Sequence, residues 1–281
     1  ILQSLVQEKK AKKIDTNTPT PAFVLGRSAT GLYAIRELGQ QGIPICSEGV
    51  GSHTASWSKY LTHTPRKLEA KNDEERVKNL LASTPNSTND QAFIVASSDQ
   101  DVAFLCRYAE QLSGKFHLPS SIMTGLANDI MNKDTLYHLC DSHGVAAPKC
   151  WTKGADELMA LEDELYFPCL IKPSKIHVVK TKMGGRKLWV IKNTTEYRSV
   201  VNTLPIGDTD WIVQEIIPGP ESEIWLYTAY FDRESRPHQA FTARKTRQYP
   251  PGFGSASLVY SEENVELKSL CEDFFKKISY E

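Results

Sequence analysis

Hydrophobic and polar positions in the first part of the chain follow the rhythm of strand, loop and helix. Residues 22–26 form a short apolar run that ends in glycine, and residues 32–38 repeat apolar side chains at helical spacing. Gly42 ends this predicted helix, and residues 43–46 begin a second apolar run. The order and length are typical of a βαβ unit.

The same rhythm returns at residues 92–99, an apolar strand that ends in Ser-Ser-Asp. Asp99 is the predicted N-cap of the helix that follows, since its side chain can accept a bond from the first turn. Alternating strands and helices predict a parallel, doubly wound sheet over about residues 20–120. Such sheets bind ligands beyond the carboxyl ends of their strands. The polar residues expected at that edge are Arg27, Ser28, Thr30, Ser97 and Ser98.

From residue 129 the pattern changes. Residues 129–145 predict one helix, in which Leu136, Leu139 and Cys140 are buried and Gly144 forms the C-cap. Strand-like runs follow, and the last of them predict two antiparallel strands around a polar turn. The second half is therefore expected to be α+β, with mostly antiparallel sheet.

A composition shift near residue 120 marks the predicted domain boundary. The fold class expected is α/β: a Rossmann-like doubly wound N-terminal lobe, then an α+β domain. The predicted organisation has four parts. An N-terminal helix and linker (1–19) precede the Rossmann-like domain (20–120). A linker helix with a lid subdomain (121–214) and the start of a C-terminal subdomain (215–281) follow.

Composition restricts the partners. The 281 residues are 40% hydrophobic and 24% charged, and the formal net charge of −1 gives no reason to expect nucleic acid. No apolar run is long enough to predict a membrane span. The six cysteines are scattered without a CxxC pair, which favours free thiols and a cytoplasmic, reducing compartment.

Lys172 is the first candidate for chemistry. The apolar run 167–171 reads as a buried strand that ends on this lysine, and Pro173 is expected to stop the strand ladder. A buried ammonium group is costly unless an anion meets it. Farther along, Gly184 and Gly185 stand between cations, which predicts either a mobile anion-binding loop or a solvated hairpin turn.

Residues 211–217 predict a strand that is apolar on parts of both faces, and a Pro-Gly-Pro turn breaks it. Its end can offer backbone groups to the edge of a purine, and a carboxylate after the turn can accept ribose hydroxyls. The alternative is a core strand with an acidic surface turn.

Three cations lie close together on a later predicted strand. Lys245 and Arg247 are expected to share one face, with Arg244 on the other. Two cations on one face suit a phosphoryl group that is being transferred. A solvated strand face explains the same pattern.

Other nucleotide and metal patterns are missing. No GxxxxGK[ST] string occurs, and residues 26–31 lack the middle glycine of GxGxxG, so a nicotinamide oxidoreductase is not expected. His138 and His143 are separated by about 140° around a helix and do not converge, so no metal site is predicted.

The ordered set of these segments resembles the ATP-grasp superfamily over about residues 20–281. The segments are NKDTLYHLCDSHGVAAPKCW, FPCLIKPS, the glycine loop, VQEIIPGPESE and ARKTRQYPPGFGSASLV. The RQYPP string is similar to that of predicted ATP-dependent carboxylate–amine ligases in this superfamily.

The resemblance implies roles for individual residues. Lys133 and Lys172 would hold the nucleotide phosphates, under a lid that carries Gly184 and Gly185. The residues implied at the adenine are Gln214, Glu215, Ile216 and Ile217, through the backbone of Glu215 and Ile217. Glu221, or else Glu223, would bind the ribose. The residues implied at the γ-phosphate and acyl phosphate are Lys245, Arg247 and Arg244.

The function implied is an ADP-forming ligase that joins a small carboxylate to an amine through an acyl phosphate, with ATP and magnesium. Arg27, Ser28 and Thr30 are substrate-site candidates, unless they only cap a helix. A homodimer is also implied. Nothing after residue 260 resembles the family's metal-binding strands, so the magnesium ligands are expected beyond Glu281 or lost. A protein that ends there is expected to be inactive, and a non-catalytic nucleotide-binding module is the alternative.

Overall fold

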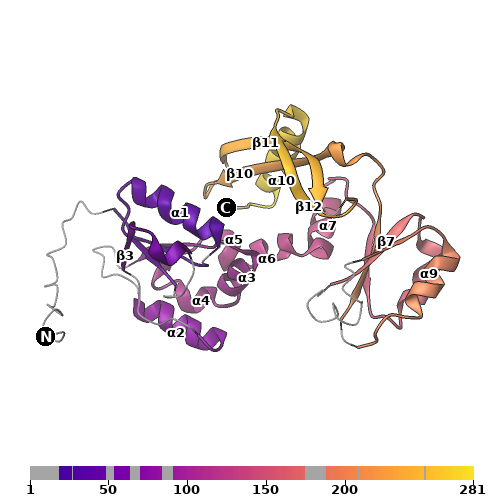
Figure 1. Cartoon of the computed structure of the whole chain (residues 1–281), viewed down its shortest axis with the longest axis horizontal. Coiled ribbons are helices and arrows are strands. Elements are labelled where there is room, and N and C mark those ends of the chain that lie inside the picture. Colours follow the sequence, from indigo (N-terminus) through magenta and orange to yellow (C-terminus); the bar gives the residue numbers. More distant parts are fainter. Residues whose placement is uncertain are drawn as a thin grey trace, which may run out of the picture. The chain divides into compact units, whose positions relative to one another are not determined.

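The computed structural model describes residues 19–26, 28–48, 54–63, 70–83, 91–174, 188–207, 209–249 and 251–281. The chain divides into two compact units, residues 1–128 and 129–281 (Figure 1). The domain boundaries expected from the sequence stay predictions.

The first unit contains a five-stranded parallel sheet with the strand order β3-β2-β1-β4-β5. The chain runs outward from β1 to β3 and then returns to the other side of β1 with β4. The carboxyl ends of β1 and β4 therefore flank the point where the strand order reverses, which is the ligand edge of such sheets. The strands are β1 (Ala22–Val24), β2 (Ile45–Ser47), β3 (Leu61–His63), β4 (Ala92–Val95) and β5 (Phe116–His117).

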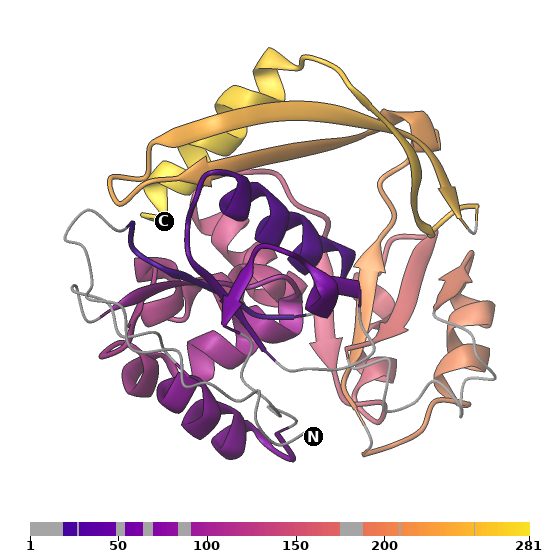
Figure 2. The same cartoon turned by 60° about the vertical axis from the view of Figure 1, so that its left-hand side comes forward.

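Helices cover both faces of this sheet (Figure 2), as the doubly wound prediction requires. Phe23 and Ile94 pack with residues of the helices after β3 and β4. Val24 and Ile45 point to the other face, where they pack with the first helix. The helical elements are α1 (Ala29–Gln40), η1 (Thr54–Trp57), α2 (Asp73–Ser83), α3 (Asp99–Arg107), α4 (Ala109–Leu112), α5 (Ser120–Met123) and α6 (Leu126–Met131).

The N-cap predicted for α3 is wrong by one residue. Ser98 is the N-cap, because its backbone is extended and its hydroxyl accepts a bond from Asp101 N at 3.2 Å. Asp99 is already the first helical residue. Its carboxylate lies in the first turn, where negative charge is favourable.

The long helix predicted from residue 129 is two helices. α6 ends at Met131, and Asn132 caps α7 (Lys133–Ser142) by accepting a bond from Asp134 N. Leu136, Leu139 and Cys140 are half-buried rather than buried, since β6 and α10 cover only part of α7 among the described residues. His143 is the C-cap, and Gly144 follows it with φ of 71°.

The second unit contains a four-stranded antiparallel sheet with the order β6-β9-β7-β8. One face packs on η2 (Leu158–Glu164) and α9 (Thr194–Val201), around the buried Tyr197 and Trp211. The Tyr197 hydroxyl donates to the Leu158 carbonyl at 2.7 Å. The strands are β6 (Cys150–Lys153), β7 (Cys169–Pro173), β8 (Trp189–Ile191) and β9 (Trp211–Glu215).

β7 ends at Pro173, as expected, although the proline itself still belongs to the strand. It is the last residue of β7 and lies opposite Trp211, and Ser174 N donates to Asp210 O beyond it. Within the described residues, β8 pairs with residues 169–171, so no described residue on that side needs an N–H from Pro173.

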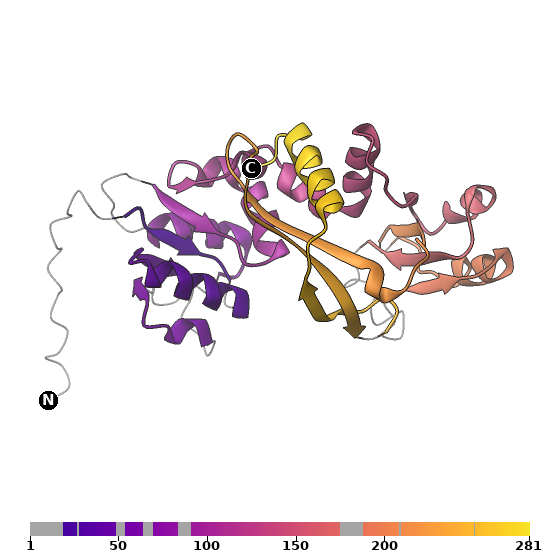
Figure 3. The same cartoon turned by 90° about the horizontal axis from the view of Figure 1, so that it is seen from above.

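A three-stranded antiparallel sheet with the order β10-β11-β12 follows η3 (Glu221–Glu223). α10 (Val265–Lys277) lies along it in Figure 3, with the rings of Phe231 and Phe275 5.0 Å apart. The strands are β10 (Ile224–Phe231), β11 (Pro237–Tyr249) and β12 (Ser255–Ser261). The predicted α/β fold with an antiparallel second half is confirmed.

All six cysteines are free thiols, and Cys46 and Cys169 are buried. The helices in the described part of the chain are too short or too polar to cross a membrane.

Candidate functional site

A cavity of about 780 Å³ lies in the second unit, at the ends of β7 and β9 and the start of β10. It brings together nine residues that the sequence singled out from four separate segments. They are Lys133, Lys172, Gln214, Glu215, Ile216, Ile217, Glu221, Glu223 and Lys245. The volume is within the range of small-molecule sites.

Lys172 is half-buried near the end of β7, and its Nζ donates to Gln214 Oε1 at 2.8 Å. Gln214 belongs to the neighbouring strand β9, so strand pairing positions both side chains. Burial, and after it the positive charge of Lys133, lowers the pKa of the Lys172 ammonium to about 8. An anion bound in the cavity would favour the ammonium form of Lys172 and so raise its pKa again.

Lys133 is the first residue of α7 and is exposed. It lines the same cavity and interacts directly with Lys172. Two ammonium groups this close repel each other, so the pair favours a polyanionic ligand over an empty site.

The strand end predicted to meet a purine is only partly available. Glu215 N donates to Lys149 O at 2.9 Å, so this N–H is not free. The Glu215 carboxylate accepts a bond from Lys149 N at 3.1 Å. Ile216 and Ile217 lie beyond the last residue of β9, and Ile217 is 61% exposed. The available backbone and apolar surface therefore belong to residues 216–217.

Glu221 is tied to the loop after β11. Its Oε1 accepts a bond from Gly252 N, and hydrogen bonds from Gln248 and then Gly252 hold the pKa of Glu221 below its usual range. Glu223 is more exposed and lies 3.9 Å from Arg244. Both carboxylates line the cavity, and the lowered pKa of Glu221 favours its ionised form, which accepts hydroxyl donors.

The prediction that Lys245 and Arg247 share a face is wrong. Lys245 pairs with Val259, whereas Arg247 pairs with the adjacent Leu258, because β11 bulges at Thr246. Neighbouring residues of β12 point to opposite faces, so their partners on β11 do too.

Only one of the three cations predicted on this strand therefore lines the cavity. Lys245 does so, and its Nζ donates to Gly254 O at 3.4 Å. Arg244 Nε lies 2.9 Å from Glu262, and its guanidinium stacks over the Trp225 ring. Arg247 is exposed and is not among the cavity-lining residues that the structure describes.

The remaining predicted residues lie elsewhere. Gly184, Gly185 and Arg27 fall outside the described residues. Ser28 and Thr30 belong to the first unit, where Ser28 caps α1 by accepting from Gly31 N at 3.4 Å. Both are exposed at the ligand edge of the parallel sheet.

Sequence reasoning missed the loop that closes the cavity after β11. Gln248, Gly252, Phe253 and Gly254 line it, and Gly252 has φ of 93°, which few other residues adopt. The glycines of GFG directly after the recognised RQYPP string were the available signal.

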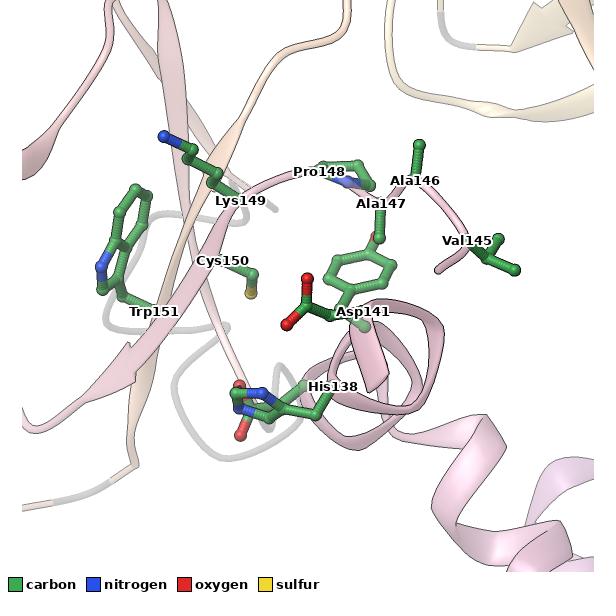
Figure 4. A pocket seen from close by; sticks show the side chains of 11 residues that line it. His138, Asp141, Val145, Ala146, Ala147, Pro148, Lys149, Cys150 and Trp151 are labelled. Atoms are coloured by element: carbon green, nitrogen blue, oxygen red, sulfur yellow. Dashed lines mark ion pairs between the residues drawn. The ribbon is translucent and has the colours of Figure 1, made fainter. Parts of the chain in front are cut away.

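A second cavity of about 410 Å³ lies between α7 and β6 (Figure 4). Asp141 and Cys150 point into it, while His138 lies at its rim, 4.0 Å from Asp134. Burial raises the pKa of the Cys150 thiol to about 11, with a smaller contribution from Asp134, so the thiol stays protonated. In the described part of the chain, no three His, Cys, Asp or Glu side chains form a metal site.

No family model matches the chain. The D-aspartate ligase of Enterococcus faecium (strain Aus0004) is 22% identical over 197 residues, which cover 66% of this chain and 47% of that protein. The chain thus spans about half the length of this curated relative.

Solved structures share the fold at low identity. The N5-carboxyaminoimidazole synthase of Aspergillus clavatus, in complex with ADP and 5-aminoimidazole ribonucleotide, has a TM-score of 0.61 at 13% identity, covering 94% of this chain and 64% of that chain. The L-amino acid ligase of Bacillus licheniformis has a TM-score of 0.62 at 15% identity, covering 94% and 62%.

Proposed function

We propose that the chain is a member of the ATP-grasp superfamily, whose fold it shares, and that it belongs to an ADP-forming ligase that joins a carboxylate to an amine. The proteins that it resembles are ATP-grasp carboxylate–amine ligases. The resemblance drawn from the sequence is confirmed at that level, while substrates and mechanism belong to the proposal.

The observation that carries the proposal is the distribution of charge in the larger cavity. Lys133, Lys172 and Lys245 provide positive charge for a polyphosphate. Glu221 and Glu223 provide acceptors for ribose hydroxyls, and the apolar Ile216 and Ile217 provide a surface for the purine. One nucleoside polyphosphate satisfies all three parts.

In the proposed reaction, an oxygen of the substrate carboxylate attacks the γ-phosphorus of ATP, and the bond to the β-phosphate oxygen breaks, giving an acyl phosphate and ADP. The amine nitrogen then attacks the acyl carbon, phosphate leaves, and the nitrogen loses a proton. Lys172 and Lys133 hold and neutralise the phosphates, and Lys245 stabilises the group in transfer. Magnesium also belongs to the proposed reaction, and no cluster of three His, Cys, Asp or Glu side chains that could hold it occurs among the described residues.

The first test is ADP binding, measured by calorimetry for the chain and for Lys172→Ala. Losing one charge-assisted phosphate contact is expected to cost about 1.5–3 kcal/mol, or about tenfold to more than a hundredfold in affinity. Lys153→Ala is the matched control, because Lys153 is an exposed lysine at the end of β6. Equal affinity for both variants would contradict the placement of the nucleotide.

The second test separates ligation from binding. ADP release that requires both a carboxylate and an amine, screened with pools of amino acids and small acids, would support the ligase. Tight ADP binding with no such turnover would instead support a nucleotide-binding module. The homodimer and the substrate roles of Arg27, Ser28 and Thr30 stay predictions.

A further inference from the structure

The acceptor that holds Lys172 is neutral. Lys172 Nζ donates to the Gln214 amide oxygen at 2.8 Å, and among the described residues no carboxylate forms an ion pair with it. A half-buried ammonium group normally acquires an anionic partner, because its desolvation is otherwise uncompensated.

The carboxylates on the surrounding elements are engaged elsewhere. Glu215 on β9 accepts from Lys149 N, and Glu221 on η3 accepts from Gly252 N. Glu223 lies beside Arg244, and Asp134 on α7 lies beside His138.

The other titratable groups facing Lys172 add no negative charge at neutral pH. Lys133 at the start of α7 and Lys245 on β11 are cations that line the same cavity. Cys150 on β6 is a protonated thiol, because burial raises its pKa to about 11. Lys133 therefore adds positive charge at Lys172 that no carboxylate hydrogen-bonded to Lys172 offsets among the described residues.

An amide at position 214 has a particular consequence. The Gln214 amide oxygen accepts a hydrogen bond from Lys172 Nζ and so fixes the direction of the ammonium group. Because the amide is neutral, the positive charge of Lys172 stays uncompensated. A glutamate of almost the same shape would accept the same bond and neutralise Lys172 before any ligand arrived.

We propose that Gln214 is a positioning residue, which aims Lys172 into the cavity while leaving its charge for the ligand, so that a nucleotide polyphosphate binds together with a proton. This inference rests on the proposed nucleotide site. Gln214 touches Lys172 and acts through it.

The direction of the pH effect follows from the free protein. Burial and then Lys133 lower the pKa of Lys172 to about 8, so above that pH the free lysine is largely neutral. Bound phosphates favour the ammonium form and raise this pKa again. Nucleotide affinity is therefore highest below about pH 8 and falls as the pH rises through this value, by up to about tenfold per pH unit for one proton.

The experiment is ADP titration by calorimetry between about pH 7.5 and about pH 9.5, where the terminal phosphate is already ionised. Each pH is measured in two buffers with different ionisation enthalpies, which gives the number of protons taken up. The wild-type chain is expected to take up a proton fraction that increases above about pH 8, while its affinity falls.

Two variants test the amide. Gln214→Glu is expected to bind ADP at least about tenfold more weakly at about pH 7.5 and to lose the proton uptake, because the carboxylate keeps Lys172 charged. Gln214→Met removes the acceptor but adds no charge, so it is expected to weaken binding while proton uptake persists. Gln111→Glu makes the same chemical change on the exposed surface of α4 and is expected to match wild type.

Wild-type ADP binding without pH dependence or proton uptake would overturn the inference but leave the nucleotide site standing. Gln214→Glu with wild-type affinity and uptake would overturn it as well. No ADP binding by the wild-type chain would overturn the proposed function itself. The wild-type measurement decides the proton linkage even if a variant fails to fold.

Discussion

At the scale of single residues, Arg76 bridges two carboxylates in the described part of the first unit. Its guanidinium donates to both carboxylate oxygens of Glu48 at 2.6 and 2.7 Å, and to Asp101 at 2.6 Å. The side chains of Glu48 and Asp101 are only 11% and 7% exposed, so neither carboxylate can turn to water. Arg76 thereby links α2 to the end of β2 and to the first turn of α3.

Arg76→Ala is expected to lower the free energy of unfolding by about 3 kcal/mol, because it leaves two poorly solvated carboxylates without their cation. Arg107→Ala is the control, since Arg107 pairs with Asp73 in an exposed bridge and is expected to cost less than about 1 kcal/mol. Urea unfolding measures both. Similar losses for the two variants would show that burial does not decide the strength of these bridges.

At the scale of elements, helix α9 is defined by its first turn. Asn193 Oδ1 accepts from Glu196 N at 2.9 Å, and Glu196 Oε2 accepts from Lys192 N at 2.8 Å. This reciprocal pair satisfies donors that the helix itself cannot. The buried Tyr197 follows directly, so the cap fixes the residue that anchors the helix to the four-stranded sheet.

Asn193→Ala is therefore expected to destabilise the chain by about 1 kcal/mol, the usual cost of a lost N-cap. Asn202→Ala, at the exposed opposite end of α9, is the matched control and is expected to change stability by less than about 0.5 kcal/mol. Thermal unfolding of both variants compares them. An equal loss at both ends would rule out the capping explanation.

At the scale of the whole molecule, the two compact units have separate hydrophobic cores, one around the parallel sheet and one around the four-stranded sheet. The nine predicted residues that meet in the larger cavity all belong to the second unit. Nucleotide binding in the second unit can therefore be measured separately from any ligand binding at the edge of the parallel sheet in the first unit.

Hydrogen exchange with and without ADP is expected to show protection concentrated in residues 170–174, 214–224, 245–249 and 251–254, which line or adjoin the cavity. Amides of the parallel sheet, residues 22–24 and 92–95, are expected to change little. Protection confined to the first unit would contradict the assignment of the nucleotide to the second.

Sequence alone determined the order and type of most elements and the segments that supply the cavity. Apolar runs of four to eight residues and glycine or proline breaks are local signals, so the strand at Lys172 and the turn at residues 218–220 could be predicted. The N-cap of α3 could be predicted only to within one residue, because Ser98 and Asp99 are both residue types that cap helices well. Only the backbone conformation chose Ser98.

Tertiary structure decided which side chains meet, because strand register and bulges depend on partners far away in the chain. The bulge at Thr246 removed Arg247 from the face of Lys245, which alternation along one strand could not reveal. The bond from Glu215 N to Lys149 crosses 66 residues of sequence, as the β6–β9 pairing requires. The contact between Lys172 and Gln214 likewise depends on the pairing of β7 with β9. The sequence near Lys172 could not show that its hydrogen-bond acceptor would be a neutral amide.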